Sequence, residues 1–259
     1  MSHAVPDRPA KIRLDRLLVE RGLAESREKA QALILAGQVL VRGQKAAKPG
    51  HAVPADAAVS VAGPALPYVG RGGLKLAAAL DRFAIDVQGK VCLDIGASTG
   101  GFTDCLLQRN AARVYAVDVG SGQLDWRLRQ DPRVVVRERV NARYLAWDLI
   151  GENADLVTLD VSFISVTLIL PAVVQFLRPE SRMVVLAKPQ FEAGRAQVGK
   201  GGIVRDPEVH REVVDKVRGA VRGLGFEHVE WMESPVPGVE GNREFLVYGW
   251  EWKQVRSGA

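Results

Sequence analysis

The chain has 259 residues, of which 47% are hydrophobic and 25% are charged, as in soluble globular proteins with one large or two unequal domains. No apolar run reaches the roughly 18 residues of a membrane-spanning helix, and residues 1–10 lack the apolar stretch of a secretory signal. We therefore expect a cytoplasmic protein with no membrane partner. The net charge of +5 favours an acidic partner such as nucleic acid.

Cys92 and Cys105 are the two cysteines of the chain. Two cysteines in a chain of this length do not make a disulfide framework, and no cluster of histidine and cysteine has the spacing of a zinc site. We expect both thiols to pack in the core, and we expect no metal site.

The first part of the chain, residues 11–63, has the pattern of a small α+β domain that follows a disordered tail over residues 1–10. Apolar residues at helical spacing predict one helix that ends at Gly22. Ser26 is a typical N-cap for a second helix, which Gly37 ends.

Two short strands are predicted after these helices, at Val39–Val41 and 58–61. Two prolines then mark a linker over residues 64–70. The larger domain is predicted over residues 71–252, followed by a short tail at 253–259.

In the larger domain, short apolar runs alternate with helical segments. After a helix over 74–83, the predicted strands are 91–95, 114–119, 134–136, 156–159, 183–187, 226–232 and 245–250. Alternating strands and helices predict an α/β, Rossmann-like parallel sheet with helices on both faces. The last two strands have no helix between them, so we expect an antiparallel hairpin at the sheet edge.

A glycine-rich turn follows the first of these strands. Asp94 ends the strand, Gly96–Phe102 forms the turn, and Asp118 ends the next strand. The spacing is neither that of a dinucleotide fingerprint nor that of a P-loop. A carboxylate at Asp118 is well placed for the two ribose hydroxyls of a nucleoside cofactor, so we predict S-adenosylmethionine; the alternative is a generic turn with an incidental acid. The expected cofactor-binding residues are Asp94, Gly96, Ala97, Ser98, Gly100, Gly101, Phe102, Asp118, Asn141 and Asp160.

Two charged residues directly follow apolar strands: Asp160 and Lys188. Ligands of open α/β sheets bind at the carboxyl ends of the strands, and a lysine there is costly without a partner or a function. The two residues are either catalytic or a purely structural pair. Methylation of an exocyclic amine is disfavoured, because Asp160–Phe163 lacks the Asn/Asp-Pro-Pro-aromatic motif. Methylation of a base carbon through a cysteine nucleophile is disfavoured, because neither cysteine follows a strand at this edge. The remaining acceptor is an oxygen atom.

Six motifs in the same order make the chain resemble the TlyA/haemolysin-A family, in which an S4 domain precedes an FtsJ-like ribose 2′-O-methyltransferase domain. The motifs are Arg71–Leu76, Asp94–Phe102, Leu159–Ser165, Lys188–Glu192, Gly199–Val204 and Gly241–Phe245. The resemblance implies a catalytic tetrad at Lys75, Asp160, Lys188 and Glu244, with Glu240 as second choice for the last position.

A ribose hydroxyl is a poor nucleophile and needs a base. A lysine beside a second lysine and a sulfonium cation loses its proton more readily, so Lys188 is the expected base, with Asp160 orienting it. The resemblance also implies S-adenosylmethionine-dependent 2′-O-methylation of cytidine in 16S or 23S rRNA, or both. The expected partners are rRNA or ribosomal subunits, with no obligatory protein partner.

The S4 resemblance implies a surface that binds structured RNA. Basic residues at the start of the second helix oppose the helix dipole unless a phosphate lies between them. The expected RNA-binding residues are Arg13, Arg16, Arg27, Lys29, Arg42 and Arg71. For each of them, an ordinary solvated charge is the competing interpretation.

Three other functions remain open at this stage. A membrane-active haemolysin needs a spanning or strongly amphipathic segment, and the sequence contains none. A catalytically silent ribosome-binding protein is disfavoured by the intact tetrad. A methyltransferase acting on RNA bases differs from a ribose methyltransferase in the nucleoside that it produces.

Overall fold

The computed structural model describes residues 10–35, 37–46, 48–61, 67–238 and 241–253. The chain divides into two compact units, residues 1–66 and 67–259, and each is described here by itself. The predicted tails and the first part of the predicted linker fall almost wholly outside the described residues.

The first unit is a small α+β domain built on two helices and two small sheets. Its elements are β1 (Lys11–Arg13), α1 (Leu14–Glu20), α2 (Arg27–Leu35), β2 (Val39–Val41), β3 (Gln44–Lys45), β4 (Ala52–Pro54) and β5 (Val59–Val61). Strand β1 pairs with β4, and β2 lies between β3 and β5. Gly22 and Gly37 have φ of 67° and 68°, as expected of residues that follow helix ends, and Ser26 Oγ accepts from Lys29 N at 3.2 Å.

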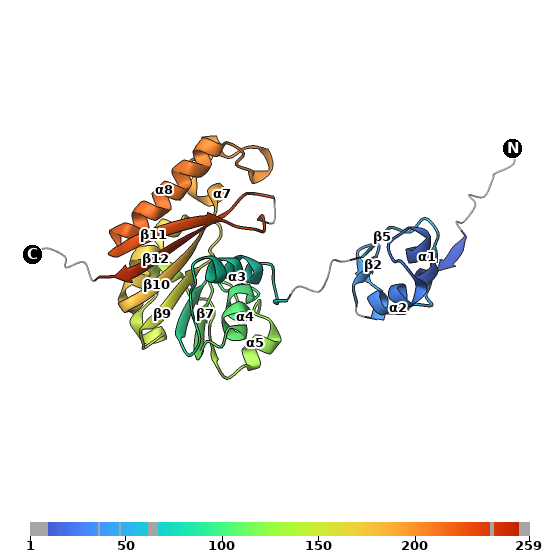
Figure 1. The fold of residues 1–259 in the computed structure, drawn as a ribbon, viewed down its shortest axis with the longest axis horizontal. Coiled ribbons are helices and arrows are strands. Elements are labelled where there is room, and N and C mark those ends of the chain that lie inside the picture. The colour runs from blue at the N-terminus through green and yellow to red at the C-terminus, as the bar shows by residue number, and fades with distance from the viewer. Residues whose placement is uncertain (1–9, 36, 47, 62–66, 239–240, 254–259) are drawn as a thin grey trace, which may run out of the picture. The chain divides into compact units, whose positions relative to one another are not determined.

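The second unit is built on a seven-stranded sheet in the order β11-β12-β10-β9-β6-β7-β8 (Figure 1). The strands are β6 (Val91–Ile95), β7 (Arg113–Val117), β8 (Val134–Arg137), β9 (Ala154–Leu159), β10 (Leu177–Ala187), β11 (Phe226–Glu233) and β12 (Phe245–Trp252). Strands β6 to β10 are parallel, whereas β12 is antiparallel to both β10 and β11. The predicted hairpin at the sheet edge is therefore confirmed.

Helices cover both faces of this sheet. The α-helices are α3 (Gly72–Arg82), α4 (Gly101–Gln108), α5 (Trp126–Gln130), α6 (Leu170–Val173), α7 (Pro189–Glu192) and α8 (Pro207–Gly223). Single 3₁₀ turns are η1 (Ala142–Tyr144), η2 (Trp147–Leu149), η3 (Val166–Leu168), η4 (Val174–Phe176), η5 (Arg195–Gln197) and η6 (Lys200–Gly202). Helices α3, α4 and α5 pack on one face, and α6 and α8 pack on the other.

The strands are buried on both sides because successive side chains enter opposite cores. In β10, Met183 and Val185 join the core under α8, whereas Val184 and Leu186 join the core under α3 and α4. Such strands read as continuous apolar runs rather than as alternating ones. The Rossmann-like fold predicted from these runs is confirmed, with the terminal hairpin making the sheet mixed.

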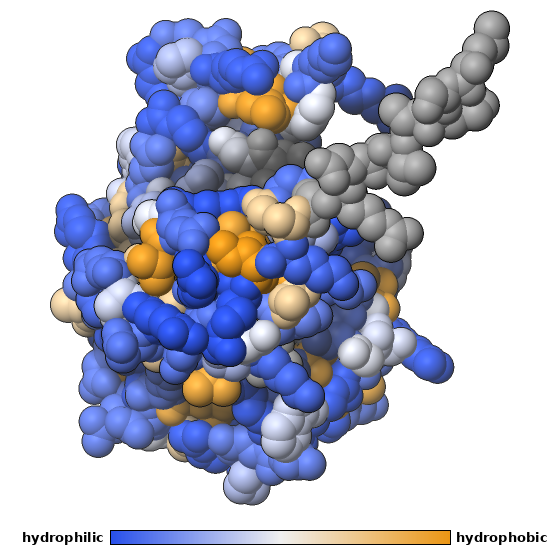
Figure 2. Space-filling model, turned by 90° about the vertical axis from the view of Figure 1, so that its right-hand side faces the viewer, coloured by the Kyte–Doolittle hydropathy of each residue, from blue (hydrophilic) through white to orange (hydrophobic). Residues whose placement is uncertain are grey.

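No helix in the described part of the chain is long and apolar enough to cross a membrane. On the face shown in Figure 2, hydrophilic residues cover most of the surface, and apolar residues form small separate patches.

Candidate active site

The turn between β6 and α4 requires glycine for two physical reasons. Gly96 and Gly100 have φ of 85° and 98°, in a region that side chains with a Cβ rarely adopt. Close packing also leaves no room: a Cβ on Gly96 would lie 2.4 Å from the backbone oxygen of Asp160, and one on Gly101 would lie 3.0 Å from Gly73 N. The turn therefore lies directly against the end of β9 and the start of α3.

Asp94, at the end of β6, links this strand to α4 and β9 through hydrogen bonds. Its carboxylate is fully buried and accepts hydrogen bonds from Thr103 Oγ1 at 2.6 Å and Thr158 Oγ1 at 3.0 Å. Burial raises the pKa of Asp94 to about 7. Because Asp94 lines neither cavity beside the turn, the expected direct contact with a cofactor does not fit its position. Gly100 is likewise outside both cavities and packs against Leu128.

A cavity of about 460 Å³ opens at the carboxyl ends of β6 and β7. Asp118 lines it and accepts from Ser98 N at 2.8 Å and from Gly120 N at 2.7 Å. Asn141 lines the same cavity and caps η1 by accepting from Arg143 N at 3.0 Å. The fixed carboxylate keeps lone pairs for hydroxyl donors, so the cavity suits the sugar of a nucleoside.

A second cavity, of about 830 Å³, adjoins the first, and Gly96, Ser98 and Asp160 line both. All four tetrad residues line the larger cavity. They come from four elements: Lys75 from α3, Asp160 from the end of β9, Lys188 from the end of β10, and Glu244 from the start of β12. The fold therefore brings together residues up to 169 positions apart in sequence.

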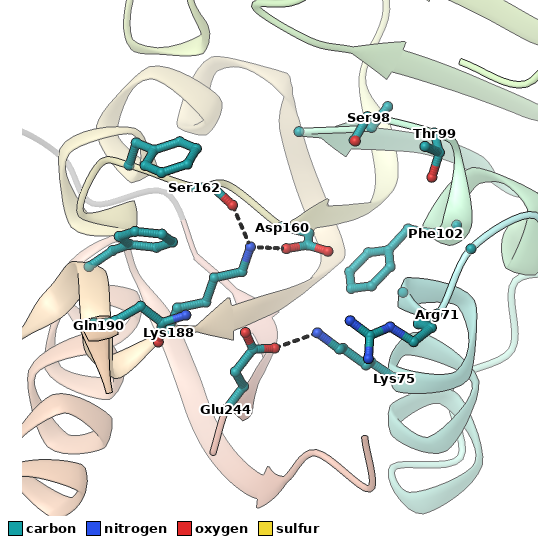
Figure 3. Close-up of a pocket in the computed structure, with 18 of the residues that line it drawn as sticks. Arg71, Lys75, Ser98, Thr99, Phe102, Asp160, Ser162, Lys188, Gln190 and Glu244 are labelled. Carbon is teal, nitrogen blue, oxygen red and sulfur yellow. Dashed lines mark hydrogen bonds and ion pairs between the residues drawn. The ribbon is translucent and has the colours of Figure 1, made fainter. Parts of the chain in front are cut away.

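The tetrad forms two ion pairs (Figure 3). Lys188 Nζ lies 2.6 Å from Asp160 Oδ1 and donates to Ser162 Oγ at 2.8 Å. The contact with Asp160 is poorly aligned for a hydrogen bond, so Asp160 Oδ1 has no aligned donor among the described residues. Lys75 Nζ donates to Glu244 Oε2. Lys75 is 8% exposed, Lys188 9% and Glu244 3%, so these charges are largely withdrawn from water.

Two aromatic rings form one wall of the larger cavity. Phe163 is 92% exposed and has φ of 65°, an unusual conformation for a bulky residue. Its ring centroid lies 5.2 Å from that of Phe191. An exposed phenylalanine beside a polar pocket provides a flat surface on which a planar group can stack.

A buried carboxylate at Glu192 links the segments that carry Asp160 and Lys188. It accepts from Val166 N at 2.6 Å and Ser165 Oγ at 2.5 Å, and Lys216 Nζ on α8 donates to it at 3.0 Å. The sequence alone does not single out Glu192, Ser162 or Phe163, because their contacts form across the fold, although each lies within one of the six motifs.

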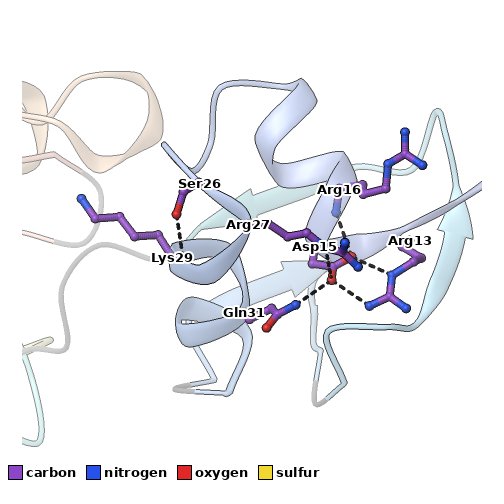
Figure 4. A network of polar contacts seen from close by, with 7 residues as sticks. All are labelled: Arg13, Asp15, Arg16, Ser26, Arg27, Lys29 and Gln31. Atoms are coloured by element: carbon purple, nitrogen blue, oxygen red, sulfur yellow. Dashed lines mark hydrogen bonds and ion pairs between the residues drawn. The ribbon is translucent and has the colours of Figure 1, made fainter.

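In the first unit, buried Asp15 gathers basic side chains (Figure 4). Arg13 Nη2 donates to it at 2.8 Å and Arg27 Nε at 3.1 Å, and hydrogen bonding from Arg13 is the main reason that the pKa of Asp15 is lowered. Arg16 lies 3.7 Å from Glu20, and Lys29 pairs with Glu25. Neither Arg42 in this unit nor Arg71 in the other has a carboxylate partner among the described residues.

The two cysteines lie in the core of the second unit. Cys92 and Cys105 are fully buried, and burial raises the pKa of both thiols, that of Cys105 to about 12. Neither lines the cavities, which agrees with their prediction as packing residues. Glu240, the second choice for the tetrad, lies outside the described residues.

Comparison with known proteins gives a consistent result. The family model described as FtsJ-like methyltransferase matches residues 68–250, and the model described as S4 domain matches residues 12–59. The chain is 51% identical over 239 residues to a candidate rRNA methyltransferase, YqxC, of Bacillus subtilis, covering 92% of this chain and 85% of that one.

It is also 49% identical over 237 residues to the 16S/23S rRNA (cytidine-2′-O)-methyltransferase TlyA of Mycobacterium tuberculosis, covering 91% of this chain and 88% of that one. A solved structure of a candidate hemolysin from Streptococcus thermophilus superposes with a TM-score of 0.70 at 43% identity, covering 96% of this chain and 90% of that one.

Proposed function

Because the chain belongs to the FtsJ-like methyltransferase family and carries an S4 domain, we propose that it methylates rRNA with S-adenosylmethionine. The proposed acceptor is the 2′-hydroxyl of a cytidine, the activity named for the relative from Mycobacterium tuberculosis. A ribosomal substrate would place the enzyme in the cytoplasm.

The observation that carries this proposal is the Lys188–Asp160 pair, 2.6 Å apart, at the boundary of the two adjoining cavities. In this proposal Asp118 binds the ribose of the cofactor in the smaller cavity, and the larger cavity, of about 830 Å³, has room for a nucleotide. The glycine turn at Gly96–Gly101 lies against Asp160, which suits the close approach of a ligand backbone. When bound there, S-adenosylmethionine supplies an activated methyl group.

The chain's own residues supply the proton chemistry. Lys188 Nζ would accept the hydroxyl proton as the ribose oxygen takes up the methyl group that bound S-adenosylmethionine would supply. Asp160 and Ser162 hold that amine in position through their 2.6 Å and 2.8 Å contacts.

The second ion pair positions the acceptor. Lys75 and Glu244 are buried in the same cavity and offer one donor and one acceptor for the ribose. Arg71 lines the cavity as well and supplies a cation for the adjacent phosphate, while Phe163 provides a surface for a base that has left its stack.

Mapping methyl groups on rRNA from cells with and without the protein tests this function. We expect 2′-O-methylcytidine at one or more rRNA positions only when the protein is present, and purified protein should restore it on unmethylated subunits. A methyl group on a base would contradict the proposed acceptor, and unchanged rRNA would contradict the proposed reaction.

A further inference from the structure

Gln190 lies in the larger cavity without a role in the chemistry described above. It follows Lys188 by two residues, at the start of α7, and lines the cavity together with all four tetrad residues. Its side-chain Oε1 is enclosed, and no donor in the described part of the chain bonds to it. A buried acceptor without a donor costs free energy, so the amide would gain from turning towards a ligand in the cavity that supplies a donor.

The surroundings of Gln190 suit a nucleobase. Phe191 is its neighbour in the chain, and the Phe191 ring packs 5.2 Å from that of exposed Phe163. Aromatic side chains that stack a base and polar groups that read its edge together make the usual pocket for an unstacked nucleotide. Because Gln190 lines the same cavity as these two rings, its amide is a candidate for contact with the edge of a base stacked there.

We propose that Gln190 selects cytosine as the target base, with its amide oxygen accepting a hydrogen bond from the cytosine amine. This inference rests on the proposed ribose methylation and adds the residue that chooses the nucleotide. Cytosine carries an N–H₂ donor at position 4, whereas uracil carries an oxygen acceptor there. A uracil in the same pose would set oxygen against oxygen and leave the buried Gln190 Oε1 without a donor.

The amide also offers a matching second contact. An amide presents one acceptor and two donors, so Gln190 Nε2 can donate to cytosine N3 while Oε1 accepts from the amine. Uracil carries N3–H, a donor, at that position. A site built to pair with polar groups rejects a substrate that leaves those groups unpaired far more strongly than an apolar site rejects a change of shape.

The test compares ribosomal subunits that carry C or U at the mapped methylation site. For wild-type protein we expect kcat/KM for the C substrate to exceed that for the U substrate by about ten- to hundred-fold. Gln190→Met preserves length and removes the polar atoms. It should lower kcat/KM for the C substrate by a similar factor and leave that for the U substrate nearly unchanged.

Two further variants keep the result interpretable. Gln190→Glu retains an acceptor oxygen and should still favour C over U. Gln130→Met makes the same change on an exposed glutamine of α5 and should keep the wild-type ratio. Thermal unfolding and cofactor affinity are measured for each variant to identify any that fail to fold. If Gln190→Met does not fold, the preference of Gln190→Glu for C over U is the test.

The proposal is overturned if Gln190→Met keeps the wild-type preference, if wild-type protein uses C and U equally, or if the variant loses both substrates alike. These outcomes differ from failure of the proposed function. If the proposed function is wrong, wild-type protein forms no 2′-O-methyl nucleoside on either substrate, and no base preference can be measured.

Discussion

Asp94 is a buried side chain whose charge state affects stability. Its pKa is raised to about 7 by burial, while an unfolded aspartate titrates near pH 4. Between these values the folded protein holds a proton that the unfolded chain has released, so this group makes stability fall as pH rises from about 4 to about 7. Above that range its contribution is constant.

We predict that Asp94→Asn removes this dependence. Relative to wild type, the variant should gain about 2–4 kcal/mol in free energy of unfolding between pH 4 and pH 7, and then no more. Urea titrations across this range measure it, with Asp148→Asn, on an exposed aspartate, as the control. A difference between Asp94→Asn and wild type that stays constant from pH 4 to pH 8 would show that Asp94 is ionised throughout.

Arg42 is the expected RNA-binding residue of the first unit that has no carboxylate partner among the described residues. It lies in the turn between β2 and β3 with φ of 51°, and it is exposed. We expect Arg42→Ala to weaken rRNA binding and to reduce the slope of log K against log salt by about one, without loss of stability. Arg16→Ala, whose charge Glu20 partly offsets at 3.7 Å, should change the slope less. Equal slopes for Arg42→Ala and wild type would remove Arg42 from the interface.

The meeting of the four expected tetrad residues in one cavity could be predicted from the sequence, because each follows an apolar strand or lies within a recognisable motif. The Lys188–Asp160 pair was also expected, because both residues follow neighbouring parallel strands. The other pairings could not be predicted, because they join distant elements. Nothing local indicates that Asp15 would hold Arg13 and Arg27, or that Asp94 would turn away from the cavity towards two threonines. The position of Asp94 next to the glycine turn made it resemble a ligand-binding residue.

Among the elements, buried strands were predicted best, because their apolar runs are continuous. The bounds predicted for β6 were those observed. Strands β1 and β4 were missed, since they are three residues long and depend on pairing with each other. The first half of β10 was missed as well, because Leu177–Arg182 is mostly polar and lies at the sheet end.

Replacing glycine in the turn between β6 and α4 tests whether close packing matters in addition to backbone strain. Gly96 and Gly89 both have positive φ, 85° and 69°, but a Cβ on Gly96 would lie 2.4 Å from the oxygen of Asp160, whereas one on Gly89 would meet nothing within 4 Å. We expect Gly89→Ala to cost about 1 kcal/mol of stability and to leave cofactor affinity unchanged.

Gly96→Ala should cost about 2 kcal/mol or more and lower cofactor affinity at least ten-fold, because the turn must move away from Asp160. Denaturant unfolding and calorimetric titration with the cofactor measure the two effects. Equal behaviour of the two variants would mean that the turn does not need its close contact with β9.

At the scale of the whole molecule, the two units have separate hydrophobic cores. The core of the first unit is formed by residues of α1, α2 and the small sheets, and the cores on the two faces of the large sheet draw only on residues from the second unit. We therefore expect residues 67–259 to fold alone and to bind the cofactor with nearly the affinity of the full chain. Methylation of ribosomal subunits should fall at least ten-fold, because the S4 unit no longer contributes phosphate contacts.

Cofactor affinity and the rate of subunit methylation are measured for residues 67–259 and for the full chain. Undiminished methylation by residues 67–259 would mean that the S4 unit does not deliver the substrate.

The proposed mechanism depends on Lys188 acting as the base for a ribose hydroxyl. Its most direct test is single-turnover methylation of ribosomal subunits by Lys188→Met, with 2′-O-methylcytidine quantified by nucleoside mass spectrometry. Lys90→Met, at an exposed lysine, is the control. We predict that Lys188→Met loses about 10²–10⁴-fold in rate while its cofactor affinity and unfolding temperature stay close to those of wild type. Methylation by Lys188→Met at the rate of Lys90→Met would contradict the role of Lys188 as the base.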